Sequence, residues 1–135
     1  MGRRADRAAG VLGRSWIGRA RGVLFRVRDA TQYPVCMYAM VIVRYRRPIE
    51  EVLVHQDAHR AFQRKLKEEG TILAAGPHEP RFGGMFLVRV PDDNPQKAVD
   101  AIRDADPYYQ AGVAQYELLL WNVVIGKVDL DRFGS

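Results

Sequence analysis

The pattern of apolar and polar residues predicts four β-strands between residues 37 and 121. The strands occupy residues 37–43, 71–75, 85–90 and 115–121, which are short, mainly apolar runs bounded by turn residues. Gly83-Gly84 is predicted to lead the chain into the third strand. These lengths are those of strands and are too short for buried helices.

Two stretches between the strands change to helical spacing. The first runs from Ile49 to Glu69, and Gly70 follows it at the position that commonly ends a helix. Its apolar arc is formed by Val52, His55, His59, Phe62 and Leu66. The second runs from Pro95 to Ala105, with Asn94 as the expected N-cap. Its inward positions are expected to be Ala98, Val99, Ile102 and Ala105.

The resulting order is strand, helix, strand, strand, helix, strand, which is the ferredoxin-like α+β arrangement. It places both helices on one face of a four-stranded antiparallel sheet. In a sheet with one solvent-exposed face, apolar and polar residues should alternate along each strand. Residues 37–43 and 85–90 are instead apolar at nearly every position. We therefore expect a second copy of the sheet to cover the helix-free face in a homodimer, that is, a dimeric α+β barrel. The alternative is a monomer in which residues 125–135 fold over the sheet.

The net charge of +5 is confined to the start of the chain. Residues 1–36 hold eight arginines and two aspartates, a net +6, so residues 37–135 carry a net −1. Because the folded part is close to neutral, we do not expect a nucleic-acid partner. We interpret residues 1–36 as a disordered basic extension or as sequence upstream of the true start, residues 37–124 as the domain, and residues 125–135 as a C-terminal tail. An amphipathic helix lying on an anionic surface is the alternative for the first segment, and four glycines interrupt it.

Targeting signals and disulfides are not expected. The longest wholly apolar run in the first 36 residues is Val23-Leu24-Phe25, which is too short for a signal peptide. No stretch reaches the roughly 20 apolar residues of a membrane span, so we expect a cytoplasmic protein. The single cysteine, Cys36, excludes a disulfide framework and a cysteine-based zinc site.

His55 and His59 are the first candidates for chemistry, because both lie on the apolar face of the first helix. A buried imidazole needs a partner, which is most often a backbone carbonyl. The H-x-x-x-H spacing lacks the glutamate of a zinc-protease signature, so we expect no metal. There is no phosphate loop and no nicotinamide or flavin fingerprint, so we expect no cofactor either.

Asp106 is the carboxylate that could orient one of these imidazoles. It closes the second helix, because Pro107 disfavours helical backbone at the preceding residue. In this fold the two helices are antiparallel neighbours, so the end of the second lies near the start of the first, where His59 stands. An aspartate bonded to one ring nitrogen fixes the tautomer and leaves the other nitrogen as a general base or acid. We expect a contact of roughly 2.6–3.2 Å beside a cavity. The Asp106→Asn change should then impair turnover with little loss of stability, whereas a sealed, structural pair would lose stability instead.

Three motifs resemble the YCII-related family over residues 37–122. The family has a histidine eleven residues before the glycine that ends its first helix, matched here by His59 and Gly70. It has Gly-Pro after the second strand, matched by Gly76-Pro77, and a D-P-[FY]-x-x-A-G segment, matched by residues 106–112. The charged loop at residues 78–82 is particular to this chain.

The resemblance implies a dimeric α+β barrel with a His59–Asp106 active-site pair. One characterised type in the family is a dehydrochlorinase of a chlorinated hydroxyhydroquinone. The first hypothesis is therefore a cofactor-free lyase or isomerase of a small hydroxylated molecule, in which Gly76, Pro77 and Tyr108 line the pocket. The second is a non-catalytic ligand-binding or accessory module, in which the pair is only structural.

Overall fold

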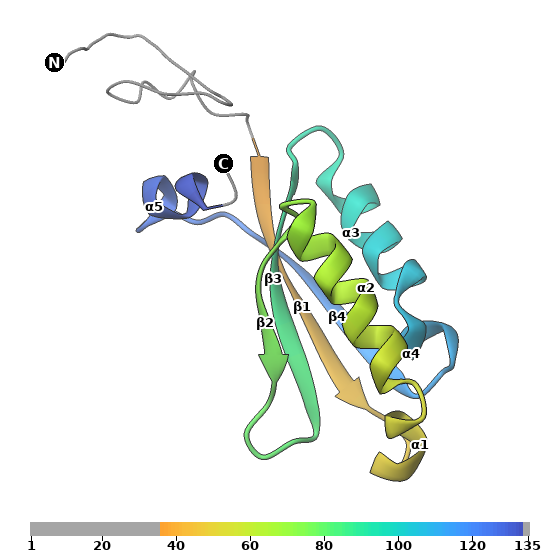
Figure 1. Cartoon of the computed structure of the whole chain (residues 1–135). Helices are drawn as coiled ribbons and strands as arrows, with labels where there is room; N and C mark the ends of the chain where they lie inside the picture. The colour runs from red at the N-terminus through yellow and green to blue at the C-terminus, as the bar shows by residue number, and fades with distance from the viewer. Residues whose placement is uncertain (1–35, 134–135) are drawn as a thin grey trace, which may run out of the picture. The chain divides into compact units, whose positions relative to one another are not determined.

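The computed structural model describes residues 36–133. The expected N-terminal extension, apart from Cys36, lies outside the described residues. The chain forms a four-stranded sheet from β1 (Cys36–Tyr45), β2 (Ile72–Pro77), β3 (Gly83–Pro91) and β4 (Ala114–Trp121). The strands lie in the order β2-β3-β1-β4, and every neighbouring pair is antiparallel (Figure 1). This is the ferredoxin-like α+β fold that the sequence predicts.

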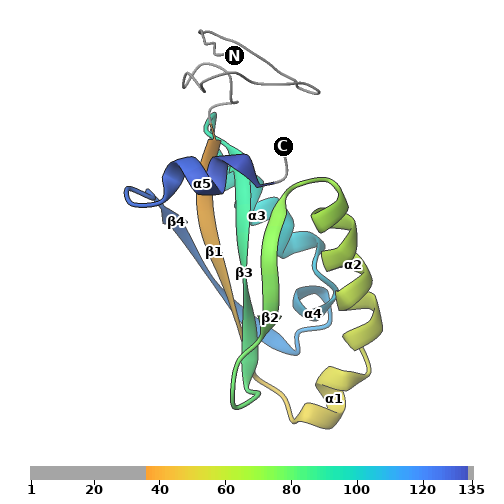
Figure 2. The same ribbon diagram turned by 60° about the vertical axis from the view of Figure 1, so that its left-hand side comes forward.

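The helices α1 (Ile49–Leu53), α2 (Gln56–Glu68), α3 (Pro95–Ala105) and α4 (Pro107–Gln110) lie on one face of this sheet (Figures 1 and 2). The core forms between this helical layer and alternate residues of the strands. In β1 these are Ala39, Val41 and Val43, none of which is more than 3% exposed. They belong to the same buried cluster as Val52 of α1 and Val99 of α3.

The helix-free face of the sheet is also apolar. Met40 and Ile42 of β1 alternate with the core residues, and they pair with Leu87 and Met85 of β3. On the other side Met40 pairs with Leu119 of β4. Met85 and Leu119 are 41% and 44% exposed, so large hydrophobic side chains on this face remain accessible.

The hairpin between β2 and β3 depends on two glycines. A Cβ atom at Gly83 would collide with the backbone carbonyl of Val43, and one at Gly84 would lie 2.7 Å from the carbonyl oxygen of Gly76. The structure therefore confirms that these glycines lead the chain into the third strand. Their missing side chains allow the neighbouring strands to approach closely at this end of the sheet.

The first helix is not continuous as predicted. It breaks at Val54 and His55, where the His55 amide bonds to the Val52 carbonyl at 3.0 Å in a tight turn. Val52 is fully buried and Val54 is 76% exposed, which agrees with the predicted apolar arc, since that arc includes Val52 and not Val54. Tertiary packing overrides the regular apolar spacing that predicted a single helix.

The second helix begins and ends where expected, with two local differences. Asn94 precedes it but has a left-handed backbone (φ 56°), and its side chain makes no capping bond. Ala105 is exposed and not inward, since it is the last residue of the helix. After it, residues 107–110 form the short helix α4 within a segment that the sequence predicts only as a connection.

The C-terminal segment contains a helix that the sequence analysis does not predict. This helix, α5 (Lys127–Arg132), carries an ion pair between Lys127 and Asp131 at 3.0 Å, one helical turn apart. Between residues 36 and 133 no helix is both long enough and apolar enough to cross a membrane.

Candidate active site

His59 lies in the first turns of α2 and is almost buried, with 11% of its side chain exposed. Its Nδ1 lies 2.7 Å from Oδ1 of Asp106, a residue 47 positions later in the chain. The predicted contact between these two side chains is therefore confirmed. The other predicted histidine, His55, precedes α2, is half-buried and does not line the cavity described below.

Asp106 is completely buried and joins two helices. Its backbone is extended, as the following proline requires, so α3 ends at Ala105. Its side chain caps α4, because Oδ1 also accepts a hydrogen bond from the amide of Tyr108 at 3.0 Å. Since α4 packs against α2, the cap brings the carboxylate to His59.

This geometry sets the tautomer of His59. An ionised carboxylate only accepts hydrogen bonds, so the proton in the contact with Asp106 belongs to Nδ1. In the neutral ring Nε2 then carries the free electron pair, and it makes no hydrogen bond to any residue between 36 and 133. An imidazole held in this way is prepared to accept a proton from a ligand.

Tyr108 holds the ring from one face. The two rings stack with centroids 3.9 Å apart and planes 9° from parallel. Tyr45 of β1 meets Tyr108 edge-on at 6.0 Å. Burial is the largest of the effects that raise the pKa of the Tyr108 phenol, so this group keeps its proton at neutral pH.

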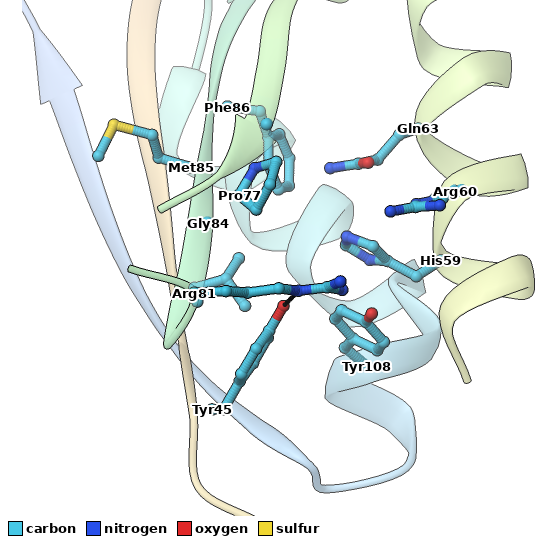
Figure 3. Close-up of a pocket in the computed structure, with 13 residues that line it drawn as sticks. Tyr45, His59, Arg60, Gln63, Pro77, Arg81, Gly84, Met85, Phe86 and Tyr108 are labelled. Atoms are coloured by element: carbon cyan, nitrogen blue, oxygen red, sulfur yellow. Dashed lines mark hydrogen bonds between the residues drawn. The ribbon is translucent and has the colours of Figure 1, made fainter. Parts of the chain in front are cut away.

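A surface-open cavity of about 50 Å³ lies beside the histidine, between α2 and the ends of β2 and β3 (Figure 3). Its lining includes His59 and the three residues expected to bind substrate, Gly76, Pro77 and Tyr108. Asp106 does not line it and supports His59 from behind. The volume of this cavity suits a few water molecules or one functional group of a ligand.

Four polar lining residues were not predicted from the sequence: Tyr45, Arg60, Gln63 and Arg81. Arg81 comes from the charged loop at residues 78–82, and this charge was the one sequence signal available. Its Nε donates to the Tyr45 hydroxyl at 3.1 Å and its Nη2 donates to Oε1 of Gln56 at 2.6 Å. The hydrogen bond to Tyr45 raises the pKa of the Arg81 guanidinium, which therefore stays charged.

A second tyrosine stands behind the pair. The Tyr116 hydroxyl and Oδ2 of Asp106 are both buried, and neither has a hydrogen-bond partner among the described residues. Burial, followed by the charge of Asp106, raises the pKa of the Tyr116 phenol strongly. The Asp106 side chain is therefore enclosed by protein, and its hydrogen bonds go to His59 and the Tyr108 amide, both through Oδ1.

No cluster of metal ligands adds to this site. Within residues 36–133, no three His, Cys, Asp or Glu side chains lie close enough together to hold a metal ion. The expectation that the protein needs neither metal nor cofactor stays a prediction.

Comparison with known proteins supports the fold and the family. The structure resembles that of 5-chloro-2-hydroxyhydroquinone dehydrochlorinase from Burkholderia phenoliruptrix AC1100 in complex with 2,5-dihydroxybenzoquinone. The TM-score is 0.51 at 19% sequence identity, and the match covers 64% of this chain and 95% of the other. No curated protein sequence matches.

The family assignment rests on the sequence match. The model of the YCII-related domain matches residues 37–122, which include His59, Asp106 and the four strands except Cys36 at the start of β1. This chain therefore belongs to the YCII-related domain family.

Proposed function

We propose that the protein is a cofactor-free lyase or isomerase, similar to a dehydrochlorinase, that acts on a small hydroxylated organic molecule. The observation that carries the proposal is the buried His59–Asp106 bond of 2.7 Å with the imidazole at a surface-open cavity. A ligand of the kind bound by the dehydrochlorinase, a hydroxylated six-membered ring, would place one edge in the cavity and the rest at its mouth.

In such an elimination His59 is the general base. Nε2 takes a proton from an O–H or C–H group of the ligand, the released electron pair forms a double bond, and the leaving group departs with its bonding electrons. Asp106 stabilises the imidazolium that forms, and the stacked Tyr108 ring keeps the imidazole in place. In an isomerisation the same nitrogen returns the proton to another atom of the ligand.

The proposal is tested with a panel of chlorinated and unchlorinated hydroxyhydroquinones in deuterated water. Chloride release and exchange of ring protons are followed by ion chromatography and NMR. Removing a general base costs about 10²–10⁴ in rate, so His59→Ala should lose nearly all exchange. His55→Ala is the matched control, because His55 lies four residues away and outside the cavity.

Exchange that persists in His59→Ala would refute the catalytic role. Binding of panel members without any chloride release or exchange would favour the alternative, a non-catalytic ligand-binding or accessory module. In that module the His59–Asp106 bond is only structural.

We also propose that the protein is a homodimer formed through the helix-free face of the sheet. The support is the exposure of large apolar side chains there, including Met85 and Leu119, which is costly on a free surface. A second copy of the same face would cover them symmetrically.

A further inference from the structure

The cavity beside His59 is lined by cations and by no carboxylate. Arg60 and Arg81 line it, together with His59 and Gln63, and Asp and Glu are absent from the lining (Figure 3). The nearest negative charge, on Asp106, is behind His59 and already accepts two hydrogen bonds. The ligand-facing side of the site therefore has an excess of positive charge.

Arg81 is fixed in place by neutral partners. Its hydrogen bonds go to the Tyr45 hydroxyl and the Gln56 amide oxygen, and its guanidinium lies 5.9 Å from the centre of the Tyr45 ring. These contacts orient the group without neutralising its charge. A guanidinium has five N–H donors, so donors remain for a ligand.

The Arg60 side chain is a second cation that lines the same cavity. It follows His59 in α2, and its side chain turns toward His59 and Arg81 in the close-up view (Figure 3). It forms no hydrogen bond or ion pair with the residues that the structure describes. Its charge acts on the site all the same, since it is one of the effects that lower the pKa of Tyr108 against the larger effect of burial.

We infer that the ligand of this cavity is an organic anion whose charged oxygen, a carboxylate or an ionised enol or phenol, lies between Arg60 and Arg81. Guanidinium groups are common protein partners of such oxygens, and Arg81 is already oriented by its hydrogen bonds to Tyr45 and Gln56. The inference rests on the proposed function for its catalytic meaning, because negative charge that forms when His59 takes a proton would be stabilised by the same cations. The anion site itself does not require turnover.

Two pairs of probes with matched shapes test the inference on the full chain. Benzoate is compared with benzamide, and 4-nitrophenolate with nitrobenzene, by NMR titration of the His59 ring and the arginine Nε–H signals. We expect each anion to bind at least about tenfold more tightly than its neutral match. The pair that shows the larger preference distinguishes a carboxylate ligand from an ionised phenol or enol.

Arginine variants assign this preference to the cavity. Arg60→Gln and Arg81→Gln should each reduce it, and the double variant should abolish it. Arg81→Lys keeps the positive charge but not the planar guanidinium group, so it should retain part of the affinity for the anion. A folded Arg81→Lys variant with partial affinity would show that the loss of affinity in Arg81→Gln is not caused by unfolding. Arg64→Gln is the matched control, because Arg64 lies one turn further along α2 and outside this cavity.

Three results would overturn the inference. These are equal binding of the charged and neutral probes, a preference that survives in the double variant, and no saturable shift at residues 59, 60 and 81 even at roughly 50 mM probe. Anion preference without His59-dependent proton exchange would leave the anion site standing and refute the proposed catalysis. Proton exchange on neutral substrates alone, without any preference for anions, would leave the proposed catalysis standing and refute the anion site.

Discussion

Replacing Asp106 separates the structural from the chemical role of the pair. Its Oδ1 accepts hydrogen bonds from Nδ1 of His59 at 2.7 Å and from the Tyr108 amide at 3.0 Å, and the residue is fully buried. The sequence suggests little stability loss for Asp106→Asn if the pair is catalytic. Complete burial changes that expectation, because the same oxygen atom holds α4 and orients the imidazole.

The magnitudes follow from these two bonds. Asp106→Asn keeps an oxygen for both donors but replaces bonds to a charged group, worth about 1.5–3 kcal/mol each, by neutral ones worth about 0.5–1.5 kcal/mol. We expect a net loss of about 2–3 kcal/mol over the two bonds. Asp106→Ala removes the helix cap, about 1 kcal/mol, and leaves the His59 donor buried without a partner, about 1–3 kcal/mol. The sum is about 2–4 kcal/mol.

Urea unfolding followed by circular dichroism measures both losses. In thermal unfolding of a domain of this size each kcal/mol lowers Tm by about 4–8 °C, so each loss is large enough to measure against wild type. Imidazole nitrogen NMR at neutral pH reports the tautomer: wild type should carry its proton on Nδ1, and Asp106→Ala should show a mixture. Equal stability of all three proteins, or an unchanged tautomer in Asp106→Ala, would refute this account of the pair.

Two further predictions concern the sheet. Burial raises the folded-state pKa of Tyr116 above its unfolded value of about 10. The stability contribution of the protonated phenol is therefore fully present below about pH 10. Above this pH the free energy of unfolding falls by about 1.4 kcal/mol per pH unit. Denaturant unfolding between about pH 9 and pH 11 should show a shallower decline in Tyr116→Phe than in wild type, and parallel declines would contradict the burial of this phenol. For the helix-free face, sedimentation of the wild-type chain should give a dimer and Leu119→Glu a folded monomer, while Leu120→Glu, its neighbour on the opposite face with 41% exposure, should remain dimeric. A monomeric wild type at about 10 μM would refute the proposed homodimer.

Much of the fold could be predicted from the sequence because it is encoded locally. The apolar runs and the helical spacing repeat over a few residues, and their order leaves few possible topologies. The end of α3 at Asp106 is also local, since Pro107 restricts the residue before it. The break at Val54 and His55 could not be predicted, because the apolar residues of both halves fit one helical arc and no glycine or proline marks the turn.

The candidate site, like the fold, could be predicted from the sequence only in part. The antiparallel arrangement of the helices, together with the family motifs, predicts from the sequence that His59 and Asp106 lie together. The contact of Arg81 with Tyr45 was not predictable, because the two residues are 36 positions apart with α1, α2 and β2 between them, and no periodicity links a loop side chain to a strand side chain. By itself the sequence determined the layers and the His59–Asp106 pair. Only the tertiary structure decided which cations face the cavity, because Arg60 of α2 and Arg81 of the loop between β2 and β3 converge there through packing that local patterns do not record.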